Sequence, residues 1–511
     1  MRDTIRACCG VVALCFGFSR SAAAEEPAPP AFQAGFAERD ITPSIGMEAP
    51  GGYGKSYHRQ IHDPCKVRAA VFGDGANRVA LVGLDALFVR RQVAAAARQA
   101  IQEKCGIEPQ CVMIAASHSH SAGPMGMILP GEYDDASPLV KSLAYEKSSN
   151  GDPKYLDHVR QQIVDAVCAA DAGKVQARCG VGAGVEDQVT FNRRFRMRNG
   201  LTYTHPNPGN PEIVEPAGPI DPQVGVIGAW DLAGKPLGAV VNFACHATTS
   251  PGGASADYVM YLEQVVRGLM GSDAVVVFLN GASGDVTQVD NRTPYQVKQF
   301  GETFARRVGG RVGAEAVKVL VSMEPGALAP VKGRSTVLKI KRRVPKPERV
   351  AKALELVQQT SPKPEPTEWS FAKETLLLDA LVARAPIADV ETQAIQVGPA
   401  VFLACPAEYF CQYGLDLEAG SGFPFTFPVS LANDCVGYVP TEEALGERGG
   451  GYETRLTSYS NLEPTAGSQI ARSLVELARG WQPGPVPALP RLSAEQRVKP
   501  WSYGNVPPEL E

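Results

Sequence analysis

The chain has 511 residues and a formal net charge of −4; 44% of its residues are apolar and 20% are charged. This is the composition of a globular protein, which argues against disorder, and the acidic balance argues against nucleic acid as a partner. The length suffices for one large domain of several layers or for two smaller domains.

The first residues have the pattern of a secretory signal. Arg2 and Arg6 precede an apolar run at 7–18, and the small residues of "SAAAEE" follow it. The run is about a dozen residues, shorter than the roughly 20 that cross a bilayer. We therefore expect residues 1–24 to be a signal peptide and the mature protein to be soluble and exported, either secreted or periplasmic.

Short apolar runs then alternate with amphipathic patterns, which is typical of an α/β protein. The expected strands are 78–85, 111–119, 237–246, 274–280 and 400–405. The expected helices, in which apolar residues recur at helical spacing, are 90–105, 153–170, 256–271 and 296–320. We predict a single large α/β catalytic domain at 25–481, with a mixed central sheet flanked by helices.

Two segments depart from this alternation. Residues 332–391 combine the basic stretch "KGRSTVLKIKRRVPKPERV", a proline-rich break and a helical pattern at 371–385. We interpret them as a strand plus a helical excursion at the domain edge, with the charges on a solvated face. Residues 482–511 are rich in proline, and we predict an irregular C-terminal tail.

Cysteine usage leaves the disulfide pattern open. Nine cysteines follow residue 24, so at least one is unpaired or intermolecular. Export permits disulfides, and the candidates close in sequence are Cys105 with Cys111 and Cys168 with Cys179. Spacing alone does not determine the connectivity.

Chemistry-bearing residues follow several predicted strands. The chain has only seven histidines; His118 and His120 follow one apolar run, His246 ends another, and Glu408 lies just past a third. Residues two apart in an extended chain point the same way, so we expect His118 and His120 to face one site. Ligands bind outside the carboxyl ends of strands in open α/β sheets, and histidines with a carboxylate are typical ligands of catalytic zinc. The pattern predicts a zinc hydrolase.

Structural interpretations of the same residues remain open. A single histidine at a strand end is more often hydrogen-bonded structure than a ligand. The loop 280–285, "NGASGD", fits a strand-to-turn connection, and Ser283 lacks the spacing of a nucleophile elbow. His58 and His62 are candidate ligands, although "HDP" is more typical of a turn. We expect the other two histidines to be structural or exposed.

Seven motifs occur in one order along the chain and carry a resemblance. They are "DITP" at 40–43, "HDP" at 62–64, "SHSHSAGP" at 117–124, "FNRR" at 191–194, "NFACHAT" at 242–248, "NGASGDVTQ" at 280–288 and "CPAEYF" at 405–410. This series resembles the neutral, non-lysosomal ceramidase family from about Phe36 to Trp481. The resemblance implies an α/β domain with a catalytic zinc that hydrolyses the amide bond of ceramide to sphingosine and a fatty acid.

The resemblance also implies a ligand set. The zinc ligands of the family fall on His118, His246 and Glu408 of this chain. A tyrosine ligand falls on Tyr452 in "GGGYETR", and Tyr438 is a less favoured alternative.

Three further positions receive roles in the same way. His120 falls beside the reacting group, where it would stabilise the oxyanion or protonate the leaving amine, and Arg193, or its neighbour Arg194, would bind a polar or anionic substrate group. Thr287 stands where the family has a serine once considered a nucleophile. Attack by zinc-bound water is therefore favoured over a covalent serine mechanism.

The sequence thus predicts an exported zinc amidohydrolase for a lipid or small-molecule N-acyl substrate, with allowance for transient contact at a membrane surface and no prediction of oligomeric state. We expect no C-terminal immunoglobulin-like domain of the kind found in larger family members. That expectation and Thr287 favour one alternative, a zinc hydrolase of another N-acyl or ester substrate. The other is a non-catalytic binding protein with a closed, structural metal site of four protein ligands.

Overall fold

The computed structural model describes residues 32–498 and 507–510. The predicted signal peptide, residues 1–24, lies outside the described residues. Most of the described strands belong to two large sheets. The first has eight strands in the order β12-β11-β10-β5-β1-β2-β3-β4. Its strands are β1 (Gln33–Asp40), β2 (Lys66–Gly73), β3 (Arg78–Leu84), β4 (Val112–Ala116), β5 (Val175–Val185), β10 (Gln223–Asp231), β11 (Pro236–Phe243) and β12 (Val275–Asn280).

The second large sheet has four strands in the order β14-β15-β16-β18. They are β14 (Val331–Lys341), β15 (Ile387–Val397), β16 (Ala400–Ala404) and β18 (Phe425–Val429). Both sheets are mixed: β3 with β4, β11 with β12 and β16 with β18 are parallel pairs, and the other pairs are antiparallel.

Alternating side chains explain how the two sheets pack. Leu81 of β3 and Phe402 of β16 belong to one apolar core between the sheets. Their neighbours Val82 and Leu403 point the other way, into the cores beneath the covering helices. Because successive side chains of a strand face opposite sides, each central strand is buried on both faces.

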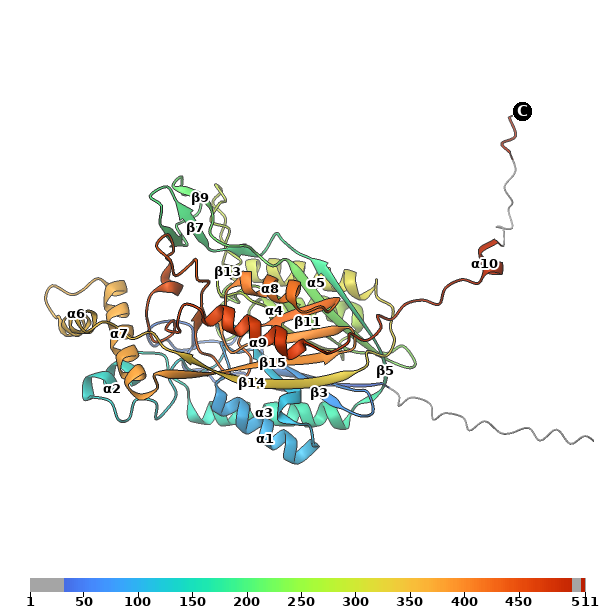
Figure 1. The fold of residues 1–511 in the computed structure, drawn as a ribbon, viewed down its shortest axis with the longest axis horizontal. Helices are drawn as coiled ribbons and strands as arrows, with labels where there is room; N and C mark the ends of the chain where they lie inside the picture. The colour runs from blue at the N-terminus through green and yellow to red at the C-terminus, as the bar shows by residue number, and fades with distance from the viewer. Residues whose placement is uncertain (1–31, 499–506, 511) are drawn as a thin grey trace, which may run out of the picture. The chain divides into compact units, whose positions relative to one another are not determined.

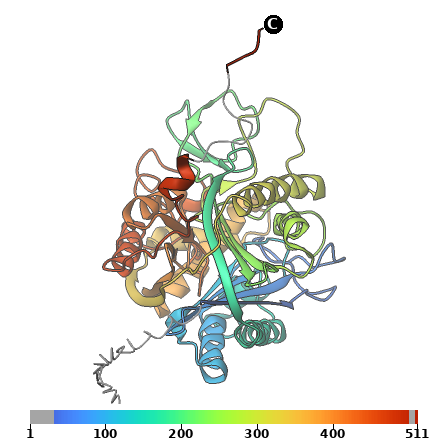
Figure 2. The ribbon, with the colours of Figure 1, turned by 90° about the vertical axis from the view of Figure 1, so that its right-hand side faces the viewer.

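Helices cover the outer faces of the sheets (Figures 1 and 2). On the eight-stranded sheet these are α1 (Arg91–Cys105) and α3 (Pro153–Ala172) over one half, and α4 (Tyr258–Met270) and α5 (Glu302–Leu320) over the other. On the four-stranded sheet they are α8 (Cys411–Gly420) and α9 (Ala466–Ala478). A separate helical cluster contains α2 (Pro138–Tyr145), α6 (Pro347–Gln358) and α7 (Pro366–Arg384).

Short strands complete the fold near the ends of the large ones. β6 (Phe191–Asn192) pairs with β13 (Val286–Thr287), and β17 (Glu408–Tyr409) pairs with β19 (Tyr438–Val439). A small sheet has the order β8-β7-β9, with β8 (Thr202–Thr204), β7 (Arg194–Met197) and β9 (Ile213–Pro216). The single-turn helices are η1 (Pro109–Cys111) and η2 (Tyr452–Thr454).

The α/β class predicted from the sequence is confirmed, and the described residues belong to one compact unit. All five predicted strands and all four predicted helices are present, as are the strand and helices expected within 332–391. The tail is less irregular than predicted, because it contains α10 (Ala494–Val498). Among the described residues, no helix combines the length and apolarity needed to cross a membrane.

The disulfide differs from both candidate pairs. Cys105 is bonded to Cys168, 63 positions further along the chain, so neither Cys105–Cys111 nor Cys168–Cys179 forms. The two cysteines belong to α1 and α3, which pack beside each other on the same face of the sheet. Proximity in space, and not in sequence, decides the pairing.

Candidate metal centre

His118 follows β4 in a sharp turn. Its backbone is in the left-handed region, with φ 66°, and its side chain is buried. The imidazole Nδ1 lies 2.9 Å from the carbonyl oxygen of Leu87. A carbonyl oxygen can only accept a hydrogen bond, so Nδ1 carries a proton, and in the neutral imidazole Nε2 presents its lone pair. That Nε2 lies 3.2 Å from Oε2 of Glu408.

His246 is held in the same way by the loop after β12. Its Nδ1 donates to the carbonyl oxygen of Ser283 at 2.7 Å, which leaves Nε2 unprotonated and 3.5 Å from Oε2 of Glu408. A Cβ on Gly284 in this loop would lie 2.4 Å from the carbonyl oxygen of Glu408. The glycine thus lets the loop that orients His246 pack closely against the strand that carries Glu408.

Glu408 begins the short strand β17. In the strand register Glu408 pairs with Tyr438 of β19, and the amide N–H of Glu408 donates to the carbonyl oxygen of Gly437 at 3.0 Å. The residue is only 9% exposed. The carboxylate is therefore fixed by backbone pairing and points at both histidines.

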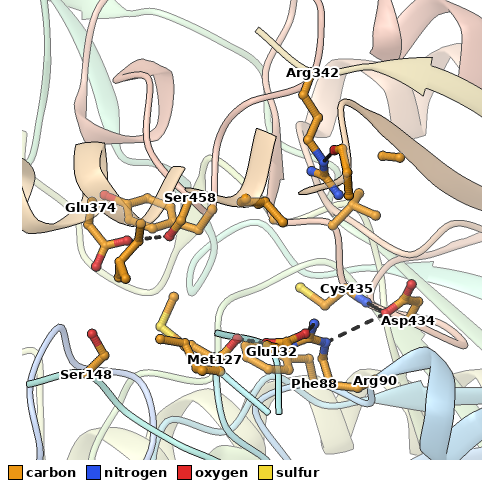
Figure 3. A pocket seen from close by; sticks show the side chains of 18 of the residues that line it. Phe88, Arg90, Met127, Glu132, Ser148, Arg342, Glu374, Asp434, Cys435 and Ser458 are labelled. Carbon is orange, nitrogen blue, oxygen red and sulfur yellow. Dashed lines mark hydrogen bonds and ion pairs between the residues drawn. The ribbon is translucent and has the colours of Figure 1, made fainter. Parts of the chain in front are cut away.

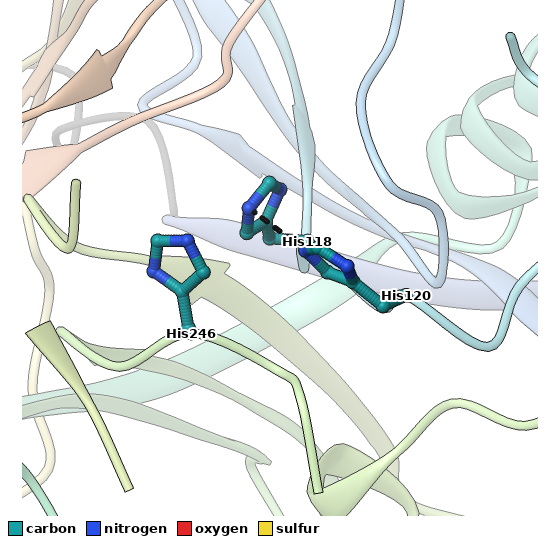
Figure 4. Close-up of side chains that lie close together, drawn as sticks. All are labelled: His118, His120 and His246. Atoms are coloured by element: carbon teal, nitrogen blue, oxygen red, sulfur yellow. Dashed lines mark hydrogen bonds between the residues drawn. The ribbon is translucent and has the colours of Figure 1, made fainter. Parts of the chain in front are cut away.

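His120 completes the cluster, but not by strand alternation. Its Nε2 lies 3.3 Å from Nε2 of His118. The strand-based reasoning was wrong because β4 ends at Ala116, so the turn at His118, and not the pleat of a strand, brings the imidazoles together. One ligand atom from each of His118, His120 and His246 lies within 4.8 Å of the others. Figure 4 shows the three imidazoles close together.

The charges of the cluster suit a cation. Burial lowers the pKa of His246 to about 3, helped by Arg193 and His118, and burial with the two other imidazoles lowers the pKa of His120 well below its usual value. Burial raises the pKa of Glu408, but His118 and His246 outweigh it and hold that pKa well below the usual range. The site therefore combines the neutral imidazoles of His120 and His246 with an ionised carboxylate.

Acceptor atoms face each other without a donor between them. Nε2 of His246 and Oε2 of Glu408 are buried and have no hydrogen-bond partner within residues 32–498 and 507–510. Unsatisfied buried acceptors are costly, and converging lone pairs also repel one another. Zinc is bound by this donor set of imidazole nitrogen and carboxylate oxygen, so the residues present fit a zinc ion.

The predicted tyrosines and arginine form a network next to the cluster. The hydroxyls of Tyr438 and Tyr452 lie 3.1 Å apart, and Nη2 of Arg193 donates to the Tyr438 hydroxyl at 3.1 Å. Arg193 also pairs with Glu453 at 2.8 Å and donates to the carbonyl oxygen of Gly284. These contacts fit a role in positioning Tyr438; binding of substrate by Arg193 stays a prediction.

The remaining candidates lie in other environments. Nε2 of His58 forms a hydrogen bond with the carbonyl oxygen of Ala122 at 2.8 Å, and Nδ1 of His62 forms one with the carboxylate of Asp63 at 2.7 Å. The hydroxyl of Thr287 donates to the side chain of Gln288 at 2.8 Å. In residues 32–498, these side chains do not join the group of His118, His120 and His246 that could hold a metal ion.

A cavity of about 370 Å³ lies beside the cluster and has Glu408 in its wall. Figure 3 shows part of the cavity lining. Its lining mixes apolar side chains such as Phe88 and Met127 with charged ones such as Arg90 and Glu132. Sequence reasoning missed these charged walls, although part of them comes from the basic stretch at 332–350.

Two solved structures share this architecture. Neutral ceramidase from Pseudomonas aeruginosa matches with a TM-score of 0.65 and 20% sequence identity, over 90% of this chain and 76% of that chain. The chain has the neutral ceramidase fold. A ceramidase complexed with C2 matches with a TM-score of 0.63 and 19% identity, over 91% of this chain and 78% of that chain. No protein-family model and no curated protein matches the chain.

The neutral ceramidase fold accounts for the position of the cluster. His118 follows β4, His246 follows β11, and Glu408 follows β16, each beyond the carboxyl end of a strand that has a parallel neighbour. This is where the sequence pattern placed a ligand site. The described residues 479–493, which connect α9 to α10, contain no strand.

Proposed function

We propose that the protein is an exported, zinc-dependent amidohydrolase that cleaves an N-acyl amide, with ceramide as the first candidate substrate. The observation that carries the proposal is the convergence of Nε2 of His118, Nε2 of His246 and Oε2 of Glu408 on one buried point. The neutral ceramidase fold supports the choice of an amide bond.

Three residues of the cluster would be the zinc ligands. His118, His246 and Glu408 would hold the zinc, and the hydrogen bonds from the imidazole Nδ1 atoms to carbonyl oxygens fix their orientation. Bound zinc would supply a Lewis acid and lower the pKa of water at the site.

The neighbouring groups would serve the amide itself. His120 lies within the cluster and would hold a hydrogen bond at the reacting carbonyl or pass a proton to the departing amine. Burial raises the pKa values of Tyr438 and Tyr452, so both phenols stay protonated and can donate hydrogen bonds. Tyr452 remains the proposed further ligand, and its hydroxyl contact with Tyr438 keeps both tyrosines beside Glu408.

Two alternatives differ in what they require of the site. In a non-catalytic protein, four protein ligands would fill the coordination sphere of the metal. A catalytic site keeps one coordination position for water. The cavity at Glu408 favours the catalytic site. A zinc hydrolase of another N-acyl or ester substrate uses the same ligands, and the charged lining of that cavity is the observation that keeps it as the second candidate.

The test is release of free fatty acid from ceramides of several chain lengths, with and without a chelator. Chelator-sensitive release is expected if ceramide is the substrate. Zinc binding without release from any ceramide would remove ceramide and leave other N-acyl and ester compounds. Release that is insensitive to chelator would contradict the zinc-dependent mechanism.

A further inference from the structure

Ion pairing around the cavity beside Glu408 is incomplete. Apart from Glu408, every carboxylate in its wall has a cationic partner. The pairs are Arg90 with Glu132 at 2.6 Å, Arg91 with Asp434 at 3.3 Å and with Asp389 at 3.4 Å, and Lys373 with Glu374 at 3.2 Å. Glu408 itself belongs to the metal cluster. The remaining cations in the wall therefore determine which charge the cavity attracts.

Arg342 and Arg384 are those remaining cations. Neither has a carboxylate within 4.0 Å among the described residues. Arg342 donates through Nε to the carbonyl oxygen of Ala385 at 3.1 Å and through Nη1 to Asn461 at 2.5 Å, which leaves Nη2 uncommitted. In the same described part of the chain, the side chain of Arg384 makes no hydrogen bond; its guanidinium lies over the ring of Tyr133, 5.5 Å from the centroid.

Both arginines come from the segment that the sequence pattern set apart. Arg342 directly follows β14, and Arg384 is the last residue of α7. The contact of Arg342 with Ala385 joins the two ends of this helical excursion at the cavity wall. Figure 3 shows Arg342 extending toward the cavity. At this position the interpretation of the basic stretch as a solvated face is wrong, because the arginine is half-buried against the cavity.

We propose that this cavity binds an anionic group of the substrate, a carboxylate, sulfonate or phosphate, through Arg342 and Arg384. The proposal rests on the amidohydrolase function above, and it narrows the substrate class to N-acyl amides that carry such an anion, such as an N-acylated amino acid. Guanidinium groups form strong, oriented hydrogen bonds to these anions. The volume of about 370 Å³ is at the lower end of the ~300–1,000 Å³ usual for small-ligand pockets.

The test uses two probes of nearly equal size that differ in charge, N-lauroylglycine and N-lauroylethanolamine. Calorimetry on the chelator-treated protein measures binding without turnover, and kcat/KM is measured on the zinc-loaded enzyme. We expect the wild type to bind the anionic probe about tenfold more tightly or better, as for a charge-assisted hydrogen bond. R384Q should reduce this advantage and the R342Q/R384Q double variant should remove it, with binding of the neutral probe unchanged.

Two controls keep the result interpretable. Arg384 is exposed and its side chain makes no hydrogen bond in the described structure, so R384Q should fold normally even if R342Q does not. R479Q removes an exposed arginine of the surface pair with Glu476, away from the cavity wall, and should keep the full preference.

The outcomes separate this proposal from the proposed function. Preference for the anionic probe that R384Q reduces, without hydrolysis of either probe or of any ceramide, would support the anion site and contradict the amidohydrolase. Hydrolysis of both probes with equal binding would support the amidohydrolase and overturn the anion site. A preference that both R384Q and the double variant leave unchanged would also overturn it.

Discussion

Nε2 of His246 lies 3.5 Å from Oε2 of Glu408, and among the described residues neither of these buried atoms has a hydrogen-bond partner. The proton of His246 is committed to the carbonyl oxygen of Ser283 on the other side of the ring. Two acceptors held this close repel each other unless a cation lies between them. In the metal-free protein this repulsion lowers the free energy of unfolding. Metal binding would remove the repulsion and raise that free energy.

Glu408→Gln should have opposite effects with and without metal. The amide can donate to Nε2 of His246, so we expect the metal-free variant to be at least as stable as the metal-free wild type. With zinc, the variant should lose most of the stabilisation, because a neutral amide replaces a charged ligand. Urea unfolding with chelator and with excess zinc measures both effects. Equal destabilisation in the two conditions would contradict the repulsion between these acceptors.

Gly51→Ala should separate the role of His120 from zinc binding. A Cβ on Gly51 would lie 2.3 Å from Nδ1 of His120, so the imidazole must move. We expect hydrolysis to fall by about tenfold or more, as for loss of a catalytic proton-transfer group, while zinc content stays near that of the wild type. Loss of zinc together with activity would instead make His120 a ligand.

Gly46→Ala is the matched control for that variant. Gly46 has φ 90° and Gly51 has φ 94°, so alanine strains both backbones similarly, by about 1 kcal/mol. A Cβ on Gly46 meets no heavy atom within 4 Å. Activity should therefore be retained in Gly46→Ala, and an equal loss in both variants would show that loop strain, and not displacement of His120, is responsible.

Glu418 should make stability decrease between acid and neutral pH. Burial raises the pKa of Glu418 to about 8, helped by the charge of Asp221 and a hydrogen bond to it. The folded protein therefore keeps a proton on Glu418 that the unfolded chain releases near pH 4.5. This contribution is fully present below pH 4.5 and is lost as the pH rises toward 8.

Glu418→Gln removes this titration and should flatten the pH dependence of the unfolding free energy over that interval. Gln223 donates to Glu418 at 2.7 Å and can keep this hydrogen bond with the amide oxygen of the variant. Chemical unfolding at several pH values tests the prediction. An unchanged slope in the variant would show that Glu418 is already ionised in the folded protein.

Removal of the disulfide between α1 and α3 should lower the unfolding free energy. Its 63-residue separation corresponds to about 4 kcal/mol in the loop-entropy description. The double variant C105S/C168S should unfold at lower denaturant than the wild type, and a reductant should bring the wild type to the level of the variant. If the reductant leaves the wild type unchanged, Cys105 and Cys168 are not bonded in solution.

The sequence was sufficient for the elements and for most of the cluster, because both depend on local patterns. Apolar runs located β3, β4, β11, β12 and β16, and the polar residues after them located His118, His246 and Glu408. Histidines at the ends of buried strands are a local signal. Such signals can be recognised in a sequence without knowledge of how the elements pack.

Other features depend on contacts between distant segments and left no local signal. The left-handed turn at His118 is stabilised by neighbours such as Leu87, and the bond of Cys105 to Cys168 requires two helices to pack together. The apposition of Arg342 and Arg384 at one cavity requires the whole excursion between them to fold back. A basic stretch in the sequence does not distinguish this arrangement from a solvated face.

The most direct test of the metal centre is the zinc content of the purified protein, measured by elemental mass spectrometry. Wild type should carry about one zinc per chain, as should His158→Ala, which removes an exposed histidine outside the cluster. His118→Ala and His246→Ala should lose zinc and hydrolytic activity together. Full zinc occupancy in either of these two variants, or hydrolysis by zinc-free wild type, would contradict the proposed centre.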